Sequence, residues 1–221
     1  MKIKPFPLLL LFNVSSRGTL SVDMESIKKA VDDKDSPYYY PDLIDRLNKF
    51  DISLTDKDFK HLYYGNFFFP MYNPYGFFNT IKNKMNAGRY ESAYEEGIEL
   101  LKQNPVNLKA LSETAICALS LGNADVAVKY MFAVTSLIKA ILNSGDGKSP
   151  YTAFVVISIA DEYELLSAMG LRSAHQALSG QTDVISIENP KNGQNKVYFN
   201  VSLPLSFNRK FFAGSIDESN I

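Results

Sequence analysis

Two histidines and a few carboxylates are the residues of this chain that could support acid–base chemistry. His61 follows Asp58 by one helical turn and stands beside Tyr63 and Tyr64. A histidine in this setting could act as a general base, and the carboxylate could orient its ring. Two ligand-type side chains do not make a metal site, and a surface pair packed beside aromatic rings has the same spacing. The pattern assigns no catalytic residue and leads us to expect neither a metal nor a cofactor.

A second candidate is the loop SGDGKSP, residues 144–150, in which two glycines flank Asp146. Glycine accepts positive φ, which could turn the carboxylate inward. We expect Asp146 to accept hydrogen bonds from backbone N–H or hydroxyl groups, as a latch that holds the sheet to the helices. A binding loop or a simple domain boundary are the alternatives. The loop does not have the pattern of a phosphate-binding loop, because Leu142 stands where that motif needs glycine, so no nucleotide site is expected there.

The pair Glu162 and Tyr163 follows Asp161 in the first turn of a predicted helix. Acidic side chains are favourable at a helix N-terminus, which is the simplest interpretation of Asp161 and Glu162. Glu162 or Asp146 could instead converge with His61 in a cleft between the helices and the sheet, which would favour a hydrolase.

Aromatic residues are concentrated between Tyr63 and Phe78, where nine of 16 residues are Tyr or Phe. Such a segment could be a stacking platform for a sugar or a peptide, or an apolar cap that covers the adjoining helices. The candidate binding residues of this segment, beside His61, are Tyr63, Tyr64, Tyr72 and Tyr75.

Composition excludes several classes of function. Lys and Arg total 23 against 24 Asp and Glu, so no basic excess exists to neutralise a nucleic-acid backbone, and no nucleic-acid partner is expected. No apolar run reaches the roughly 20 residues needed to span a bilayer. The single cysteine, Cys117, is predicted to be a small core residue.

The N-terminus has features of an export signal. Lys2 and Lys4 precede an apolar stretch from Pro5 to Phe12, and small residues follow at 14–16. This order is typical of a signal peptide, here residues 1–18, with the mature chain beginning near residues 17–21. We therefore expect an exported, periplasmic protein. A buried first strand in a cytoplasmic protein is the alternative.

An internal repeat occupies the middle of the chain. Gly88 and Ala93 recur 34 residues later as Gly122 and Ala127, which is the period of the tetratricopeptide repeat. The pattern predicts two antiparallel helix pairs, one around each glycine, with no strand between residues 77 and 142. Two units are too few to bury a continuous core, so other elements must cover their ends.

The remaining helices and strands are predicted from helix-capping residues and from runs of apolar residues. Helices are expected from about Met24, from Pro41 and after the Thr55 cap, ahead of the repeats. After residue 143, strands are expected at 152–158, 182–188 and 196–204, with a helix capped by Ser158. The predicted class is α+β: a helical tetratricopeptide-like domain at 19–143, then a small three-stranded β-α-β-β module at 144–221.

Four stretches together resemble the bacterial family catalogued as domain of unknown function 4919. They are DMESIKKAVDDKDSPYYYPDLIDRL, LTDKDFKHLYYGNFFFPMYNPYG, GDGKSPYTAFVVISIADEYELLSAMG and KVYFNVSLP. The resemblance covers about residues 23–212. It implies a bacterial protein usually made with a signal peptide, and it supplies no activity, substrate or catalytic residue.

These observations favour a non-catalytic interaction module that binds a protein or peptide partner in the cell envelope. Stacked helical repeats commonly present a concave surface to an extended peptide or a partner helix. The alternative is a hydrolase with its site between the helical repeats and the small sheet.

Overall fold

The helices of the N-terminal half begin where side chains accept hydrogen bonds from the first helical turn. The structure, a computed structural model, describes residues 22–75, 79–191 and 193–207. Asp23 accepts a hydrogen bond from the Ser26 amide, and Thr55 forms with Asp58 the capping box that the sequence predicts. These caps pair amides that a helix leaves unsatisfied in its first turn, which explains where the helices start.

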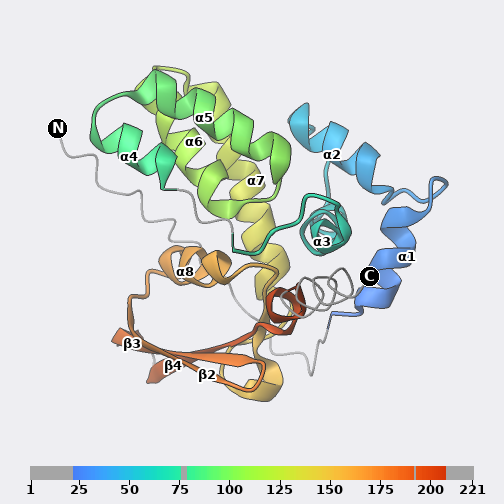
Figure 1. Ribbon diagram of the computed structural model, residues 1–221, viewed down its shortest axis with the longest axis vertical. Helices are drawn as coiled ribbons and strands as arrows, with labels where there is room; N and C mark the ends of the chain where they lie inside the picture. Colours follow the sequence, from blue (N-terminus) through green and yellow to red (C-terminus); the bar gives the residue numbers. More distant parts are fainter. Residues whose placement is uncertain (1–21, 76–78, 192, 208–221) are drawn as a thin grey trace, which may run out of the picture. The chain divides into compact units, whose positions relative to one another are not determined.

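The chain divides into two compact units, which are described separately. The helical unit comprises residues 22–141, and the α+β unit begins at Leu142, two residues before the boundary expected from the sequence. Figure 1 labels the elements of both units. Those of the helical unit are α1 (Met24–Asp32), α2 (Tyr40–Asn48), α3 (Asp56–Gly65), η1 (Asn66–Phe68), α4 (Thr80–Asn86), α5 (Tyr90–Gln103), α6 (Leu108–Ser120) and α7 (Ala124–Leu142), which ends at the boundary.

The two repeated glycines terminate helices in the same way. Gly88 follows α4 with φ of 72°, and Gly122 follows α6 with φ of 83°. In both turns the glycine amide donates to the carbonyl three residues back, and the next amide donates to the carbonyl five residues back. This is the hydrogen-bond pattern of a helix end that glycine stabilises. The described residues between 79 and 142 contain no strand, while membership of the tetratricopeptide class stays a prediction.

Small residues set the distance between α5 and α6. A Cβ placed on Gly97 would lie 2.0 Å from Oγ1 of Thr114, so the two helices meet where one of them has no side chain. Ala93 and Cys117 are fully buried in the same unit, as the sequence predicts for the cysteine. An ion pair of 2.9 Å between Lys84 and Glu96 joins α4 to α5. The three helices pack through small residues on the inside and charges on the outside.

The α+β unit is built on a four-stranded sheet. Its elements are η2 (Pro150–Thr152), β1 (Phe154–Val155), α8 (Ile159–Ala168), β2 (Ser173–Ser179), β3 (Thr182–Lys191) and β4 (Gln194–Asn200). The strand order is β1-β4-β3-β2, with β1 parallel to β4 and the other neighbours antiparallel. Ile185, Val197 and Phe199 are fully buried, and Ser158 caps α8 as expected from the sequence.

The prediction of three strands was wrong in three respects. The strand expected at 196–204 ends at Asn200, and residues 202–207 are helical. β2 was not expected at all, because its sequence SAHQALS has no alternation of apolar and polar residues. Its side chains are exposed or half-exposed on both faces, so no buried face imposes a pattern of period two. The strand expected at 152–158 is reduced to β1, because Thr152 belongs to η2 at one end and Ser158 already caps α8 at the other.

None of the helices in the described parts of the chain is long and apolar enough to cross a membrane.

Candidate functional site

One hollow of the helical unit is an aromatic groove beside α1, α2 and the end of α3. Its volume is about 570 Å³. The groove walls carry four aromatic residues and two prolines, namely Tyr39, Tyr40, Phe68, Phe69, Pro41 and Pro70. We call this hollow the aromatic groove. Its size falls within the range of small-molecule and short-peptide sites in proteins, about 300–1,000 Å³.

The floor of the aromatic groove is held in place by close packing around Gly65. A Cβ on Gly65 would lie 2.9 Å from Val31 and 3.0 Å from the Tyr40 ring, so α3 can approach α1 and α2 only with glycine there. The Tyr40 hydroxyl donates to the Asn66 side-chain oxygen at 3.0 Å. Burial raises the pKa of this phenol well above its usual value, so it stays protonated and keeps donating. Tyr40 is therefore a fixed wall of the groove.

The other aromatic residues of the groove are available to a ligand. Tyr39, Phe68 and Phe69 are half-exposed, and Pro41 and Pro70 are exposed. The ammonium group of Lys28 lies 5.7 Å from the centre of the Phe68 ring, and Lys28 also pairs with Asp32. The groove thus has flat apolar walls, and its rim carries Lys28 paired with Asp32. Such a groove can bind an extended ligand through contacts with its aromatic rings.

The aromatic segment expected from the sequence contributes rings to the groove, but these are different from the predicted Tyr63, Tyr64, Tyr72 and Tyr75. Tyr63 and Tyr64 have no exposed surface, and Tyr72 is 7% exposed, so these rings belong to the core of the helical unit. Tyr75 is half-exposed, and burial raises the pKa of its hydroxyl. The groove residues Phe68 and Phe69 lay inside the same segment, while Tyr39 and Tyr40 lay in the earlier run SPYYYP. The tyrosines next to proline in that run were the signal that could have identified them.

His61 has a packing role in this structure. Its ring stacks on Tyr38 with centroids 3.8 Å apart, and its Nδ1 lies 2.7 Å from the Lys57 carbonyl oxygen. A nitrogen that faces a carbonyl oxygen carries the proton, so Nδ1 donates this hydrogen bond. Burial lowers the pKa of His61 and favours the neutral ring. Its predicted neighbour Asp58 accepts the cap hydrogen bonds of α3 and lies 3.8 Å from Arg46.

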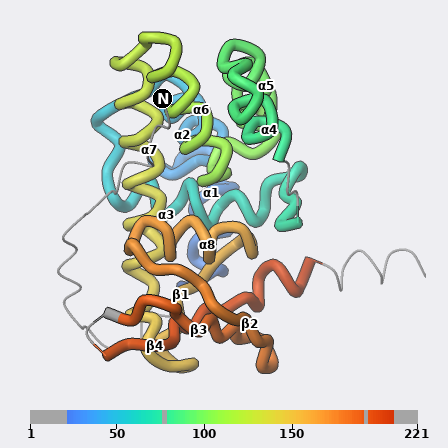
Figure 2. Tube along the Cα trace, turned by 90° about the vertical axis from the view of Figure 1, so that its left-hand side faces the viewer, coloured from blue at the N-terminus to red at the C-terminus, as the bar shows by residue number. Residues whose placement is uncertain are grey.

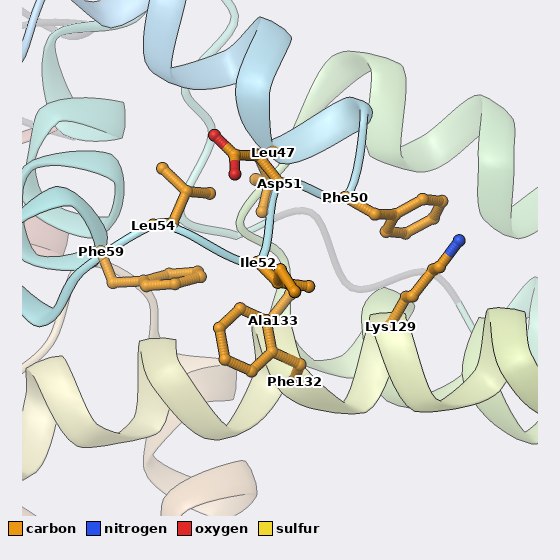
Figure 3. A pocket seen from close by; sticks show the side chains of 9 residues that line it. All are labelled: Leu47, Phe50, Asp51, Ile52, Leu54, Phe59, Lys129, Phe132 and Ala133. Carbon is orange, nitrogen blue, oxygen red and sulfur yellow. The ribbon is translucent and has the colours of Figure 1, made fainter.

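A second apolar surface of the helical unit is too shallow to hold a ligand. Figure 3 shows Ile52 and Phe132 close together and Lys129 beside Phe50. The hollow between them has a volume of about 10 Å³, which is room for one water molecule at most. The Lys129 ammonium group lies 5.5 Å from the centre of the Phe50 ring. We interpret this surface as packing between the loop after α2 and α7.

In the α+β unit, α8 and the sheet bring two carboxyl groups together. The Gln176 side chain donates from Nε2 to Glu162 at 3.2 Å and to Asp183 at 2.6 Å. The Tyr163 hydroxyl donates to the Gln176 side-chain oxygen. Glu162 has no exposed surface, Asp183 is 4% exposed, and Oε1 of Glu162 has no hydrogen-bond partner among the described residues. We call these four residues the carboxyl cluster.

The electrostatics of the carboxyl cluster favour a protonated Glu162. Burial, and then the negative charge and hydrogen bond of Asp183, raise the pKa of Glu162 to about 9. Glu162 is therefore protonated at neutral pH. In the described parts of the chain, no group of three or more His, Cys, Asp or Glu side chains could hold a metal ion.

Asp146 closes its own loop within the α+β unit. Its carboxylate accepts a hydrogen bond from the Lys148 amide at 3.0 Å, and the amides of Asp146 and Gly147 both donate to the Thr152 carbonyl oxygen. Burial opposes ionisation of Asp146, but hydrogen bonds from the Thr152 hydroxyl and the Lys148 amide outweigh it and lower the pKa. These hydrogen bonds all lie within the α+β unit, so a latch from the sheet to the helices stays a prediction.

The predicted site residues are divided between the two units. His61 and the tyrosines belong to the helical unit, whereas Asp146, Glu162 and Tyr163 belong to the α+β unit. Tyr163 also borders a hollow of about 680 Å³ that includes Arg172 and Glu188. Among the described residues of the two units, no histidine pairs with a carboxylate in the manner of a hydrolase.

Comparison with known proteins identifies a family for nearly the whole chain. The family described as Domain of unknown function (DUF4919) matches residues 25–210. No curated protein and no solved structure matches the chain. The matched range includes both units and, within them, the aromatic groove and the carboxyl cluster. The chain belongs to the family of domain of unknown function 4919.

Proposed function

We propose that this protein is a non-catalytic peptide-binding protein of the bacterial cell envelope. The aromatic groove is its binding site, and an extended, proline-containing segment of a partner protein is its ligand. The observation that carries the proposal is the groove itself, about 570 Å³ in volume, with half-exposed Tyr39, Phe68 and Phe69 along its walls.

Proline-rich peptides fit this surface for a physical reason. A polyproline II helix is extended before it binds, so it loses little conformational entropy in the complex. Its prolines pack against flat rings, and grooves lined by aromatic side chains are the usual receptors for such segments. The Tyr39 hydroxyl can also donate to a peptide carbonyl, because a polyproline II helix leaves its carbonyls unpaired.

Phe68 should contribute most of the affinity. It is one of the three half-exposed aromatic rings of the groove, and the Lys28 ammonium group lies over it. Aromatic anchors at the centre of an interface typically cost 2 kcal/mol or more when truncated to alanine, roughly a thirtyfold loss of affinity.

A titration tests the proposal. A fluorescently labelled decaproline peptide is added to the full chain, with a glycine–serine decapeptide as the flexible control. We expect decaproline to bind, and Phe68→Ala to weaken binding about thirtyfold. Tyr151→Ala is the matched control, because Tyr151 is 89% exposed and lies in the α+β unit. Equal affinity of the wild type and Phe68→Ala for decaproline would remove the aromatic groove as the site.

A further inference from the structure

The hollow of about 680 Å³ in the α+β unit lies where α8 turns into β2. Figure 2 shows α8 over one face of the sheet, as does Figure 1. Among the lining residues, Leu166 and Leu171 are buried, whereas Arg172 and Glu188 are exposed and Tyr163 is 40% exposed. The hollow therefore has an apolar base, one aromatic wall and a polar rim. We call it the α8 hollow, and its volume is within the usual range of ligand sites, about 300–1,000 Å³.

Hydrogen bonds fix the backbone of the rim. The Asn189 side chain accepts from the Arg172 amide at 2.8 Å and donates to the Gly170 carbonyl oxygen at 3.0 Å. The Glu188 amide donates to the Arg172 carbonyl oxygen at 2.9 Å. These bonds hold the turn after α8 against β3, so the Arg172 and Glu188 side chains start from fixed positions. Nε of Arg172 lies 3.4 Å from Oε2 of Glu188, and an exposed pair of this kind can rearrange around a ligand at little cost.

Tyr163 offers a ligand the face of its ring. Its hydroxyl donates to the Gln176 side-chain oxygen, so the polar end of the side chain is already paired. Gln176 is itself held by its hydrogen bonds to Glu162 and Asp183. The carboxyl cluster thus fixes the orientation of the ring before a ligand arrives, and a fixed side chain loses less entropy on binding. A flat apolar group is the natural partner of such a ring.

The charges of the rim favour a neutral ligand with neighbouring hydroxyl groups. A guanidinium offers only donors and a carboxylate only acceptors, whereas a hydroxyl both donates and accepts. An anion would be repelled by Glu188, and a cation by Arg172. Two neighbouring hydroxyls can instead accept from the guanidinium and donate to the carboxylate. A pyranose sugar combines such hydroxyls with flat ring faces made of C–H groups.

We propose that the α8 hollow is a saccharide-binding site, in which a pyranose ring packs on Tyr163 and two neighbouring hydroxyls bond to Arg172 and Glu188. β-Linked glucose units fit best, because all their ring substituents are equatorial and both ring faces carry only C–H groups. Glu162 has no exposed surface and cannot reach a bound sugar, so the site binds saccharide without cleaving it.

Isothermal titration calorimetry of the full chain with cellotriose, a soluble β-linked glucose trisaccharide, tests the site. We expect Tyr163→Ala to weaken binding about tenfold or more, and Tyr163→Phe, which keeps the ring, to stay within about twofold of the wild type. Arg172→Ala should weaken binding about fivefold, because it removes the donors of the side chain and leaves the backbone hydrogen bonds of the turn in place. Tyr151→Ala is the matched control, since Tyr151 is 89% exposed in the same unit.

Several outcomes would overturn the proposal. Cellotriose might give no heat of binding at any soluble concentration, or bind Tyr163→Ala as tightly as the wild type. An equal loss in Tyr163→Ala and Tyr163→Phe would assign the effect to the hydroxyl and not to the ring face. Inorganic phosphate that binds more tightly than cellotriose, and loses its affinity in Arg172→Ala, would make the α8 hollow an anion site.

This inference is independent of the peptide-binding proposal. The aromatic groove belongs to the helical unit, whereas the α8 hollow belongs to the α+β unit. Phe68→Ala should therefore leave cellotriose binding unchanged, and Tyr163→Ala should leave decaproline binding unchanged. A loss of cellotriose binding in Phe68→Ala would contradict a saccharide site confined to the α+β unit.

Discussion

Glu162 is the side chain whose ionisation should most affect stability. Burial and the neighbouring Asp183 raise its pKa to about 9, from an ordinary value of 4.5. Between these two values the native chain holds a proton that the unfolded chain has released. The free energy of unfolding therefore falls as the pH rises from about 4.5 to about 9.

Glu162→Gln should remove this pH dependence. Glutamine resembles the protonated acid and can donate to Asp183, so the variant should match the wild type near pH 5. At pH 8 the variant should be more stable than the wild type, by up to about 1.4 kcal/mol for each pH unit between pH 5 and pH 8. Urea unfolding at both pH values measures this. An equal difference between variant and wild type at pH 5 and pH 8 would show that Glu162 does not titrate in this way.

The contribution of Asp146 to stability depends on pH in the opposite direction to that of Glu162. Its pKa is lowered, so its contribution to stability is present above the unfolded value and is lost as the pH falls through the folded value. Asp146→Ala removes the hydrogen bonds from Lys148 and Thr152 and should lower the unfolding free energy by about 1–2 kcal/mol at neutral pH, since the group is half-exposed. Thermal unfolding measures the change. An unchanged midpoint would mean that the loop does not depend on this carboxylate.

Among the structural elements, the helix ends offer a matched pair of substitutions. Gly88 and Gly122 both have positive φ, and a Cβ on either would meet nothing within 4 Å. Gly88→Ala and Gly122→Ala should therefore each cost about 1 kcal/mol of unfolding free energy from backbone strain alone. Gly97→Ala should cost more, about 1–3 kcal/mol, because its Cβ would collide with Thr114. Denaturant unfolding of the three variants tests the order, and a smaller loss for Gly97→Ala would contradict the close approach of α5 and α6.

The helices could be predicted because local rules determine their ends. Thr55 with Asp58, Ser158, and the glycines at 88 and 122 all mark helix boundaries where the structure has them. β2 could not be predicted, because an edge strand exposed on both faces has no hydrophobic period. β1 was overestimated because all five residues of AFVVI are buried, and burial alone does not distinguish a strand from an irregular segment.

The site was only partly predictable for a similar reason. Aromatic content indicated the segment after Tyr63, but which rings face a groove depends on how α1, α2 and α3 pack against one another, and no local sequence pattern specifies that packing. Tyr63 and Tyr64 therefore lie in the core, while Tyr39 and Phe68 line the groove. The carboxyl cluster joins α8, β2 and β3, and one of those strands was missing from the predicted fold.

For the whole chain, export is a proposal that rests on the N-terminal residues, which lie outside the described parts of the structure. Lys2, Lys4 and the apolar stretch from Pro5 to Phe12 lead us to expect cleavage, with a mature chain that begins near residues 17–21. N-terminal sequencing of the protein from its native host, after fractionation, measures this directly. A chain that begins at Met1 in the cytoplasmic fraction would contradict export.

The most direct test of peptide binding is to locate decaproline on the whole molecule by NMR. Backbone amide shifts of the isotope-labelled full chain are recorded as the peptide is added. We predict shift changes in the segments that line the aromatic groove, residues 31–44 and 65–70, and none in the sheet of the α+β unit. No shift change at saturating peptide, or changes confined to other surfaces, would contradict the aromatic groove as the binding site.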